Sequence, residues 1–421
     1  MVPVPSSVMR AIPHETLTKL SIQRPTRVSL SHLYTVGRHV LDSSSQKKYI
    51  IPAQFLHAEL PIRLSQTLKI LHSSLMPQEF TTLSTFKKFT RQYYDYISIL
   101  MSISKPENET KEEEYTKVLR LLKKEHRINL VTLRQAFREI IDLNGIEKIK
   151  HLDTEEIWDR FYAITLGTRL LMAQHLALHD EKKNLVTRIA PKDVAERAIK
   201  DTRNYCEKLY NRPVPEIQLF TTDPTATTIH IEEHLHSILC ELLRNSIRTT
   251  IRHHSPEFSP SDPSSSIPSQ SRGLLFSSFL TSSSAQSPKP NSSLPPISIL
   301  IAQGAQDITI KISDHGGGMP MSAMDDAWSY FVYDDEGQLE ADVKEKEHVE
   351  RPFDCGVGVS LPFARVTARY FGGDLSFVSM EGHGTDTFLS LYRDDTCLEA
   401  FPESHSSLDD SLLPLKRTDA A

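Results

Sequence analysis

The sequence predicts an all-α four-helix bundle followed by an α+β domain with a mixed, mostly antiparallel sheet. Its 421 residues are more than one ordinary domain needs, so two or three units are expected. Through much of 53–210, apolar residues recur at spacings of three and four, the periodicity of amphipathic helices. After 210, short strand-like runs alternate with helical ones, which favours helices layered on a sheet.

The helical part contains four long amphipathic segments. We expect them over 55–72, 80–103, 111–140 and from Asp153 to 176. Pro106 separates the second segment from the third, and Asn144-Gly145 is a helix-ending signal. Long helices joined by short connections predict an antiparallel bundle.

The second part combines strands with two further helices. We expect strands over 217–220, 227–231, 297–302, 307–312, 375–380 and 387–392, and helices over 232–251 and 361–371. Residues 255–296 are rich in Ser and Pro and lack a periodic apolar pattern, so we expect a disordered insertion. The predicted division is therefore 28–200 for the bundle and 205–395 for the α+β domain, followed by a loose polar tail over 396–421.

Composition excludes several classes of protein. No run approaches the roughly 18 apolar residues that a membrane-spanning helix needs. The net charge of −6 suggests no nucleic-acid partner. Cysteines 206, 240, 355 and 397 lie far apart and include no CxxC pair, so we expect reduced thiols.

The first 48 residues are basic, serine-rich and poor in acids. This composition is typical of a mitochondrial transit peptide and equally of a flexible N-terminus, so both readings of 1–27 stay open. Pro3, Pro5 and Pro13 interrupt any early helix.

Four short motifs in the second half carry the chemistry. In the first, Glu241, Asn245 and Arg248 share one helix face at spacings of four and three. An amide oxygen is a suitable hard ligand for Mg²⁺, and a carboxylate one turn away can orient or deprotonate a nucleophile. A solvated polar helix face would have the same appearance.

The second motif, Asp314-His-Gly316-Gly-Gly318, places an acid and three glycines at the end of a strand. Glycines let a backbone approach a ligand closely, and the acid can accept a hydrogen bond from an adenine amino group. A plain glycine-rich turn is the alternative.

The third motif, Gly356-Val357-Gly358, leads into a helix whose free N–H groups can bind phosphate. It is not a Walker A loop, because no GK[ST] follows. The fourth motif, Gly384-Thr385, lies in a turn between two strands, where the threonine hydroxyl can reach a ligand or cap the turn.

In this order, the four motifs resemble the N, G1, G2 and G3 boxes of the GHKL superfamily. The resemblance implies a Bergerat fold that binds ATP and Mg²⁺ beneath a lid, here 321–355. It assigns Mg²⁺ to Asn245, adenine to Asp314 and catalysis to Glu241, as base or as water-orienting acid. The ATP-binding set it implies is Asn245, Arg248, Asp314, Gly316, Gly318, Gly356, Val357, Gly358 and Thr385.

The flanking sequence is similar to that of mitochondrial pyruvate dehydrogenase kinases and the branched-chain 2-oxo acid dehydrogenase kinase. The similarity is carried by the segments 56–64, 160–162, 169–175, 241–248 and 368–386. It implies a matrix serine kinase that phosphorylates and inactivates an E1α subunit, docks on the E2 lipoyl domain and forms a homodimer through the ATP-domain sheet. Residues 28–38 look nearer the branched-chain enzyme, so the substrate complex stays open.

Several positions depart from the family pattern. Ser237 stands where these kinases often have a histidine, with His236 beside it, which puts a His–Glu pairing in doubt. Thr165 replaces an arginine of the family's helical ligand pocket, whereas His126 and Arg169 are candidates to line a regulatory pocket. The Asp-Trp motif of pyruvate dehydrogenase kinase tails does not occur in 393–421, so docking on the lipoyl domain is expected to use the bundle alone.

Two other functions compete with this interpretation. A histidine kinase shares the ATP boxes, and His57-Ala-Glu-Leu-Pro61 resembles its phospho-acceptor box, although the proline follows after four residues instead of the usual five. The other is a scaffold that binds ATP or the complex without phosphorylating anything. Intact Glu241 and Asn245 favour the kinase over the scaffold.

Overall fold

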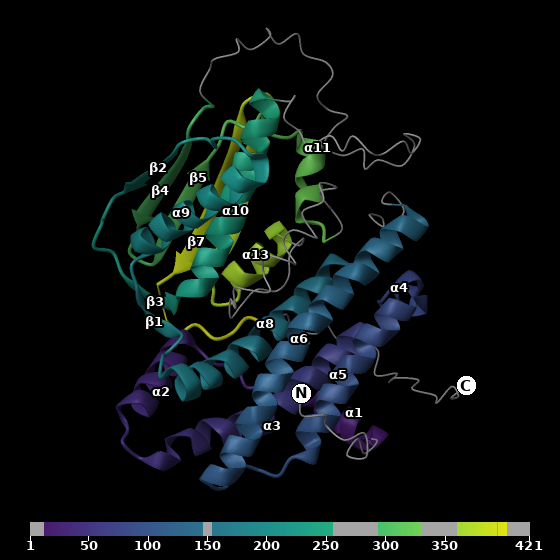
Figure 1. Cartoon of the computed structure of the whole chain (residues 1–421). Helices are drawn as coiled ribbons and strands as arrows, with labels where there is room; N and C mark the ends of the chain where they lie inside the picture. The colour runs from purple at the N-terminus through teal and green to yellow at the C-terminus, as the bar shows by residue number, and fades with distance from the viewer. Residues whose placement is uncertain (1–11, 146–153, 256–293, 331–359, 394, 402–421) are drawn as a thin grey trace. The chain divides into compact units, whose positions relative to one another are not determined.

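The computed structural model describes residues 12–145, 154–255, 294–330, 360–393 and 395–401 (Figure 1). The chain divides into two compact units. Unit 1 comprises 1–28, 33–185 and 399–421, and unit 2 comprises 29–32 and 186–398. The predicted lid and insertion lie largely outside the described residues, as does the third motif.

Unit 1 is built on a bundle of four long helices: α3 (Ile50–Leu71), α5 (Ser84–Ser102), α6 (Glu109–Asn144) and α8 (Glu155–Leu176). Helices α3 and α6 each pack against both α5 and α8, so the four form a closed ring (Figure 1). Aromatic side chains fill its centre, among them Phe89, Tyr93 and Phe161, all fully buried. Their rings meet edge to face, an arrangement favoured by the ring quadrupole. The four-helix prediction is confirmed.

The boundaries of α6 follow from its capping residues. The Asn108 side chain accepts a hydrogen bond from the Lys111 N–H at 3.0 Å, which begins the helix. Gly145 ends it with φ of 77°, a conformation that glycine adopts without a Cβ clash. Shorter helices complete the unit: α1 (His14–Ile22), α2 (Leu30–Asp42), η2 (Gln46–Tyr49), α4 (Gln78–Thr82) and the π-helical turn η3 (Ala177–Glu181).

Residues 395–401 differ from the expectation of a loose polar tail over 396–421, whereas 402–421 lie outside the described residues. Glu399 and Phe401 are buried in unit 1. The Glu399 carboxylate binds the Arg63 guanidinium of α3 at 3.1 and 2.7 Å, and the Phe401 ring lies 5.0 Å from the same guanidinium carbon. From the sequence alone, an acidic residue in a serine-rich tail is expected to be exposed to solvent. In the structure the charge of Glu399 is neutralised by the buried Arg63.

Unit 2 contains a five-stranded sheet of order β2-β4-β5-β7-β6. The strands are β2 (Ile217–Thr221), β4 (Ile297–Gln303), β5 (Asp307–Ser313), β6 (Asp374–Met380) and β7 (Gly384–Tyr392). β2 pairs with β4 in parallel, and the other neighbours pair antiparallel. The mixed, mostly antiparallel sheet is thus confirmed. A separate antiparallel pair joins β1 (Val186–Ile189) to β3 (Thr228–Ile231).

Helices α9 (Pro191–Tyr210), α10 (Glu232–His254) and α13 (Ser360–Arg369) cover one face of this sheet (Figure 1). The core lies between the two layers, because Ile308, Ile310 and Ile312 alternate inward along β5. Two short segments follow the second motif, α11 (Met321–Met324) and η6 (Asp326–Trp328). Helix α9 and strand β1 belong to unit 2, although the sequence division ran the bundle to 200, because α9 packs on α10.

No helix in the described part of the chain combines the length and the apolar character needed to cross a bilayer.

Candidate nucleotide site

The first motif lies in the middle of α10, which has one apolar face and one polar face. Leu239, Leu242 and Leu243 of this helix are buried in the core, whereas Glu241, Asn245 and Arg248 are half-buried. Acidic residues in its first turn and basic residues in its last turn match the helix dipole. Helical periodicity therefore places the predicted polar residues along the edge of the core.

These polar residues contact their neighbours on the same helix. The Glu241 carboxylate forms an ion pair with Arg244, whose guanidinium carbon lies 5.4 Å from the Tyr205 ring centre. Arg248 Nη2 lies 3.4 Å from the amide oxygen of Asn245, a contact longer than an ordinary hydrogen bond. The Asn245 oxygen therefore keeps acceptor capacity for a cation.

Asp314 lies immediately after β5, and its carboxylate is held by three donors. The Gly316 and Thr385 N–H groups donate to Oδ1 at 2.9 and 3.3 Å. The Ser246 hydroxyl of α10 donates to Oδ2 at 3.0 Å. Burial raises the pKa of Asp314, while these hydrogen bonds act in the opposite direction. One buried carboxylate thus joins three of the predicted motifs.

The fourth motif is attached to the second through backbone and hydroxyl contacts. The Asp314 N–H donates to the Thr385 carbonyl at 3.0 Å. The Thr385 hydroxyl lies 2.9 Å from that of Ser379, which in turn accepts from the Met319 N–H. The Gly382 N–H donates to the Gly317 carbonyl at 2.7 Å. The β6–β7 turn is therefore packed directly on the glycine-rich loop.

Two glycines are required by this packing. A Cβ at Gly318, where φ is +61°, would lie 2.1 Å from the Met380 carbonyl oxygen. A Cβ at Gly384 would lie 2.0 Å from the Asp314 carbonyl oxygen. Both distances are far inside van der Waals contact, so any larger residue would separate the two motifs. The sequence analysis explained these glycines by the close approach of a ligand. In the structure they also let the backbones of the second and fourth motifs approach each other.

The structure brings together Asp314, Gly316, Gly318 and Thr385, and it joins them to α10 through Ser246. Gly356, Val357 and Gly358 lie outside the described residues. Ser246 and Ser379 were missed by the sequence analysis. Ser246 follows Asn245 directly and is buried, but only the rotation of α10 against β5 shows that its hydroxyl faces Asp314.

His236 lies on a different side of α10 from Glu241 and Asn245 and contacts α9. Its Nε2 lies 3.0 Å from the Asp201 carboxylate of α9, and its ring nitrogens lie 3.7 and 3.8 Å from the Cys240 sulfur. His236, which lies beside Ser237 in the sequence, therefore contributes to the contact between α9 and α10.

In unit 1, His126 and Arg169 are both buried inside the bundle. Nε2 of His126 lies 2.9 Å from the Tyr93 hydroxyl, while its buried Nδ1 finds no hydrogen-bond partner among the described residues. Burial, with a smaller contribution from the Arg169 charge, lowers the pKa of His126 to about 3. The ring is therefore neutral at physiological pH, and the positive charge of this region resides on Arg169.

Comparison with known proteins adds an independent finding. Residues 27–205 match a family model described as mitochondrial branched-chain alpha-ketoacid dehydrogenase kinase. The chain is 29% identical over 402 residues to an Arabidopsis thaliana protein named pyruvate dehydrogenase (acetyl-transferring) kinase, mitochondrial, covering 92% of this chain and 96% of that protein.

Two further relatives have related names. A Schizosaccharomyces pombe protein with the same name is 33% identical over 244 residues, and the match covers 56% of this chain and 49% of that protein. Isozyme 4 of the human mitochondrial pyruvate dehydrogenase kinases is 26% identical over 352 residues, covering 80% of this chain and 75% of its own. Among solved structures, the catalytic domain of the histidine kinase ThkA aligns at 10% identity over 49% of this chain and 97% of that domain, with a TM-score of 0.31.

Proposed function

We propose that this chain is a kinase of the mitochondrial 2-oxo acid dehydrogenase kinase family, to whose members it is similar, and that it phosphorylates a serine on the E1α subunit of such a complex and thereby inactivates it. ATP would be the phosphoryl donor, and the complex would be the pyruvate or the branched-chain one. The observation that best supports this proposal is the Asp314 carboxylate, buried and held at the junction of β5, α10 and β7. Such a carboxylate is suited to recognising a nucleobase by a hydrogen bond.

Asp314 fits an adenine amino group by its hydrogen-bonding capacity. An ionised carboxylate offers about four acceptor positions, and three donors are already bound here. One position is left for a ligand donor in a place where water is largely excluded. Thr385, whose hydroxyl is paired with Ser379, would border the same side of the base.

Glu241 and Asn245 would act at the phosphate end of the site. The ion pair with Arg244 keeps the Glu241 carboxylate ready to accept a hydrogen bond from the attacking serine hydroxyl. Asn245 offers an amide oxygen, the hard ligand type that suits Mg²⁺. Bound Mg²⁺ would neutralise charge on the phosphates during transfer. Arg248 and the loop Gly356, Val357 and Gly358 would complete the ATP-binding set.

The sheet of unit 2 supports the proposal of a homodimer. Phe220 and Leu300 are neighbours in register on β2 and β4, and their side chains are 52% and 40% exposed. Adjacent exposed apolar residues on a sheet face are a feature of protein–protein contacts. We assign this face to the partner protomer and the docking of an E2 lipoyl domain to the helical bundle.

The compartment and the regulation follow from the same proposal. Relatives named as mitochondrial kinases support a mitochondrial location, and we propose the matrix because the substrate complexes are expected there. His126 and Arg169 would line a pocket for an anionic regulator such as a 2-oxo acid. Arg169 would supply the charge, since the His126 ring is neutral.

The decisive experiment is transfer of label from γ-labelled ATP. Purified protein is offered pyruvate and branched-chain E2–E1 complexes separately, with Asn245→Ala as the loss-of-function variant. Acid-stable label on one E1α, abolished by the substitution, is the expected result and identifies the substrate. Label on a histidine of the protein itself would indicate a histidine kinase. ATP binding without any transfer would indicate a scaffold.

A further inference from the structure

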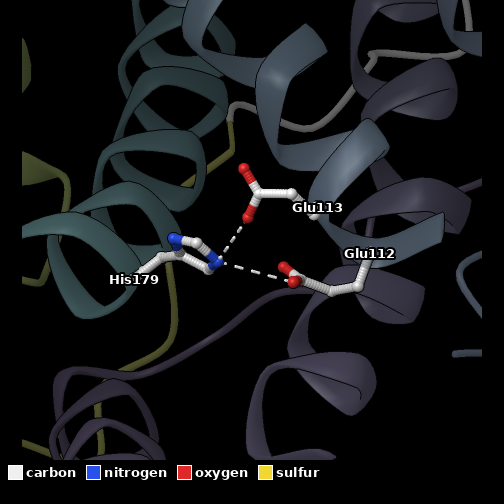
Figure 2. Close-up of side chains that lie close together, drawn as sticks. All are labelled: Glu112, Glu113 and His179. Carbon is white, nitrogen blue, oxygen red and sulfur yellow. Dashed lines mark ion pairs between the residues drawn. The ribbon is translucent and has the colours of Figure 1, made fainter. Parts of the chain in front are cut away.

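Three side chains in unit 1 converge at a place that the proposed kinase chemistry does not use. Glu112 and Glu113 lie in the first turns of α6, and His179 lies in the π-helical turn that follows α8 (Figure 2). One ligand-capable atom from each lies within 4.8 Å of the other two. His179 Nε2 is 3.5 Å from Glu112 Oε2 and 3.3 Å from Glu113 Oε2.

The other ring nitrogen of His179 faces a further carboxylate. Nδ1 lies 3.0 Å from Asp180 Oδ1, and because an ionised carboxylate can only accept, Nδ1 is the atom that would donate to it. Arg120 binds the same carboxylate at 3.0 and 2.6 Å. Arg120 Nη2 also approaches Nδ1, but at the longer distance of 3.4 Å. Metal-binding histidines commonly donate their second N–H to a carboxylate in this way.

His179 Nε2 faces one carboxylate oxygen of each glutamate (Figure 2). Three atoms that can each ligate a metal ion thus lie close together. The separations of 3.3 and 3.5 Å are longer than the 2.7–3.2 Å of an N–H···O hydrogen bond. They match the spacing of about 3.4 Å expected between two ligands that each lie about 2.05 Å from a tetrahedral zinc ion.

Glu112 is oriented by contacts to its other oxygen. The Thr116 hydroxyl donates to Oε1 at 2.7 Å, and His175 Nε2 lies 3.3 Å from the same atom. The fixed carboxylate therefore presents its second oxygen, Oε2, to His179.

The local composition also favours a cation. Glu112, Glu113 and Asp180 are all acidic, whereas Arg120 pairs with Glu113 and Asp180 and Lys182 Nζ donates to the His179 carbonyl oxygen. Arg120 is held mainly by Asp180 and reaches Glu113 only at 3.5 Å. The three acidic side chains therefore outnumber the one guanidinium that pairs with them.

We propose that Glu112, Glu113 and His179 form a binding site for a divalent transition-metal ion of the zinc class. One imidazole nitrogen and two carboxylate oxygens suit Zn²⁺. Ca²⁺ takes six to eight oxygen ligands, and Mg²⁺ prefers an octahedron of oxygens. The ion would connect the first turn of α6 to the end of α8 and so stabilise the bundle.

The test uses full-length protein stripped with a chelator and titrated with zinc chloride alone in a calorimeter. The expected result is a site present in the wild type and weakened at least tenfold in His179→Gln and Glu113→Gln. Glu113 is half-exposed, so this variant should fold even if His179→Gln does not. Glu114→Gln, at an exposed position on the same helix, is the matched control and should bind like the wild type.

Thermal unfolding supplies a second readout. Zinc should raise the melting temperature of the wild type and of Glu114→Gln, since a ligand that binds only the folded state stabilises it. The rise should be lost in Glu113→Gln. Zinc binding of equal stoichiometry and affinity in all four proteins, or in none, would overturn the proposal. Either result would leave phosphoryl transfer untouched, because no cluster residue belongs to the nucleotide site.

Discussion

Arg63 Nη2 lies 2.7 Å from Glu399 Oε2, although the two residues are 336 positions apart, and both side chains are fully buried. Glu59 binds the same guanidinium at 2.9 Å, one helical turn before it. Glu399 also accepts the Val28 N–H. The end of the described chain is thus fixed to α3 and to the entrance of unit 1 through one arginine.

Glu399→Gln should lower the free energy of unfolding by about 2–3 kcal/mol, because it weakens two buried charge-assisted hydrogen bonds from Arg63 while Glu59 still neutralises the guanidinium. Urea denaturation followed by circular dichroism measures this change. Glu15→Gln, which removes an exposed i,i+4 pair with Lys19, should leave the midpoint nearly unchanged. Equal effects of the two substitutions would show that the buried contact contributes no more than a surface pair.

Asp314 should make ATP affinity depend on pH. Its pKa is raised by burial, and the adenine contact requires an ionised acceptor, so affinity should fall as the pH is lowered through this raised pKa. Asp314→Asn should weaken binding about tenfold or more and abolish the pH dependence, since a hydrogen bond to a charged group contributes about 1.5–3 kcal/mol.

Ser246→Ala supplies the sharper test of the same relationship. Losing a donor to the carboxylate should raise the pKa of Asp314 further and move the fall in affinity to higher pH. Ser237→Ala, elsewhere on α10, should leave the profile unchanged. Fluorescence titration with a labelled nucleotide between pH 4 and pH 8 measures how affinity depends on pH. An unshifted pH dependence in Ser246→Ala would argue against the role of Asp314.

Glu241→Gln should separate binding from transfer. A side chain that orients or deprotonates the nucleophile contributes about 10²–10⁴-fold to the rate, while the amide keeps the shape of the site. Single-turnover transfer to E1α should slow by that factor with the ATP dissociation constant nearly unchanged. Glu233→Gln, in the first turn of α10, is the control. A parallel loss of ATP affinity would assign Glu241 to binding instead.

The fold was predictable where local signals coincide with long periodic segments. Asn144-Gly145 marked the end of α6 because a residue at positive φ must follow the helix. Strand β1 was missed because four residues carry too little periodicity and pair only with distant β3. Glu399 was missed because burial of an acid depends on a partner that sequence does not reveal.

The candidate site was predictable in its composition and less so in its contacts. The order of the motifs indicated Asp314 and Thr385 without showing that the Thr385 N–H binds the aspartate. The contact from Ser246 depends on the rotation of α10 against the sheet. Such details come from packing, which short-range patterns do not determine.

Leu300→Lys should dissociate the proposed dimer. A charge placed beside Phe220 on the exposed sheet face would have to be desolvated at the interface. Light scattering after gel filtration should show a dimer for the wild type and a monomer for the variant. Leu143→Lys, at an exposed position on α6, should remain dimeric. A dimer in both variants would place the interface elsewhere.

His126 should make unfolding of the bundle sensitive to acid. Burial lowers its pKa in the folded protein to about 3, against an ordinary value of 6.5 for histidine. Its contribution to stability is therefore complete above pH 6.5 and declines as the pH falls from there toward 3, because the unfolded chain binds a proton that the buried ring does not. The slope from one such group is at most about 1.4 kcal/mol per pH unit.

His126→Phe should therefore give a shallower dependence of unfolding free energy on pH between 6.5 and 4.5, even though loss of the Tyr93 contact lowers its overall stability. Exposed His32→Phe should keep the wild-type slope. An unchanged slope in His126→Phe would mean that the ring is already charged in the folded bundle. An anionic regulator would then pair with His126 as well as with Arg169, whereas a neutral ring leaves Arg169 as the cation of that pocket.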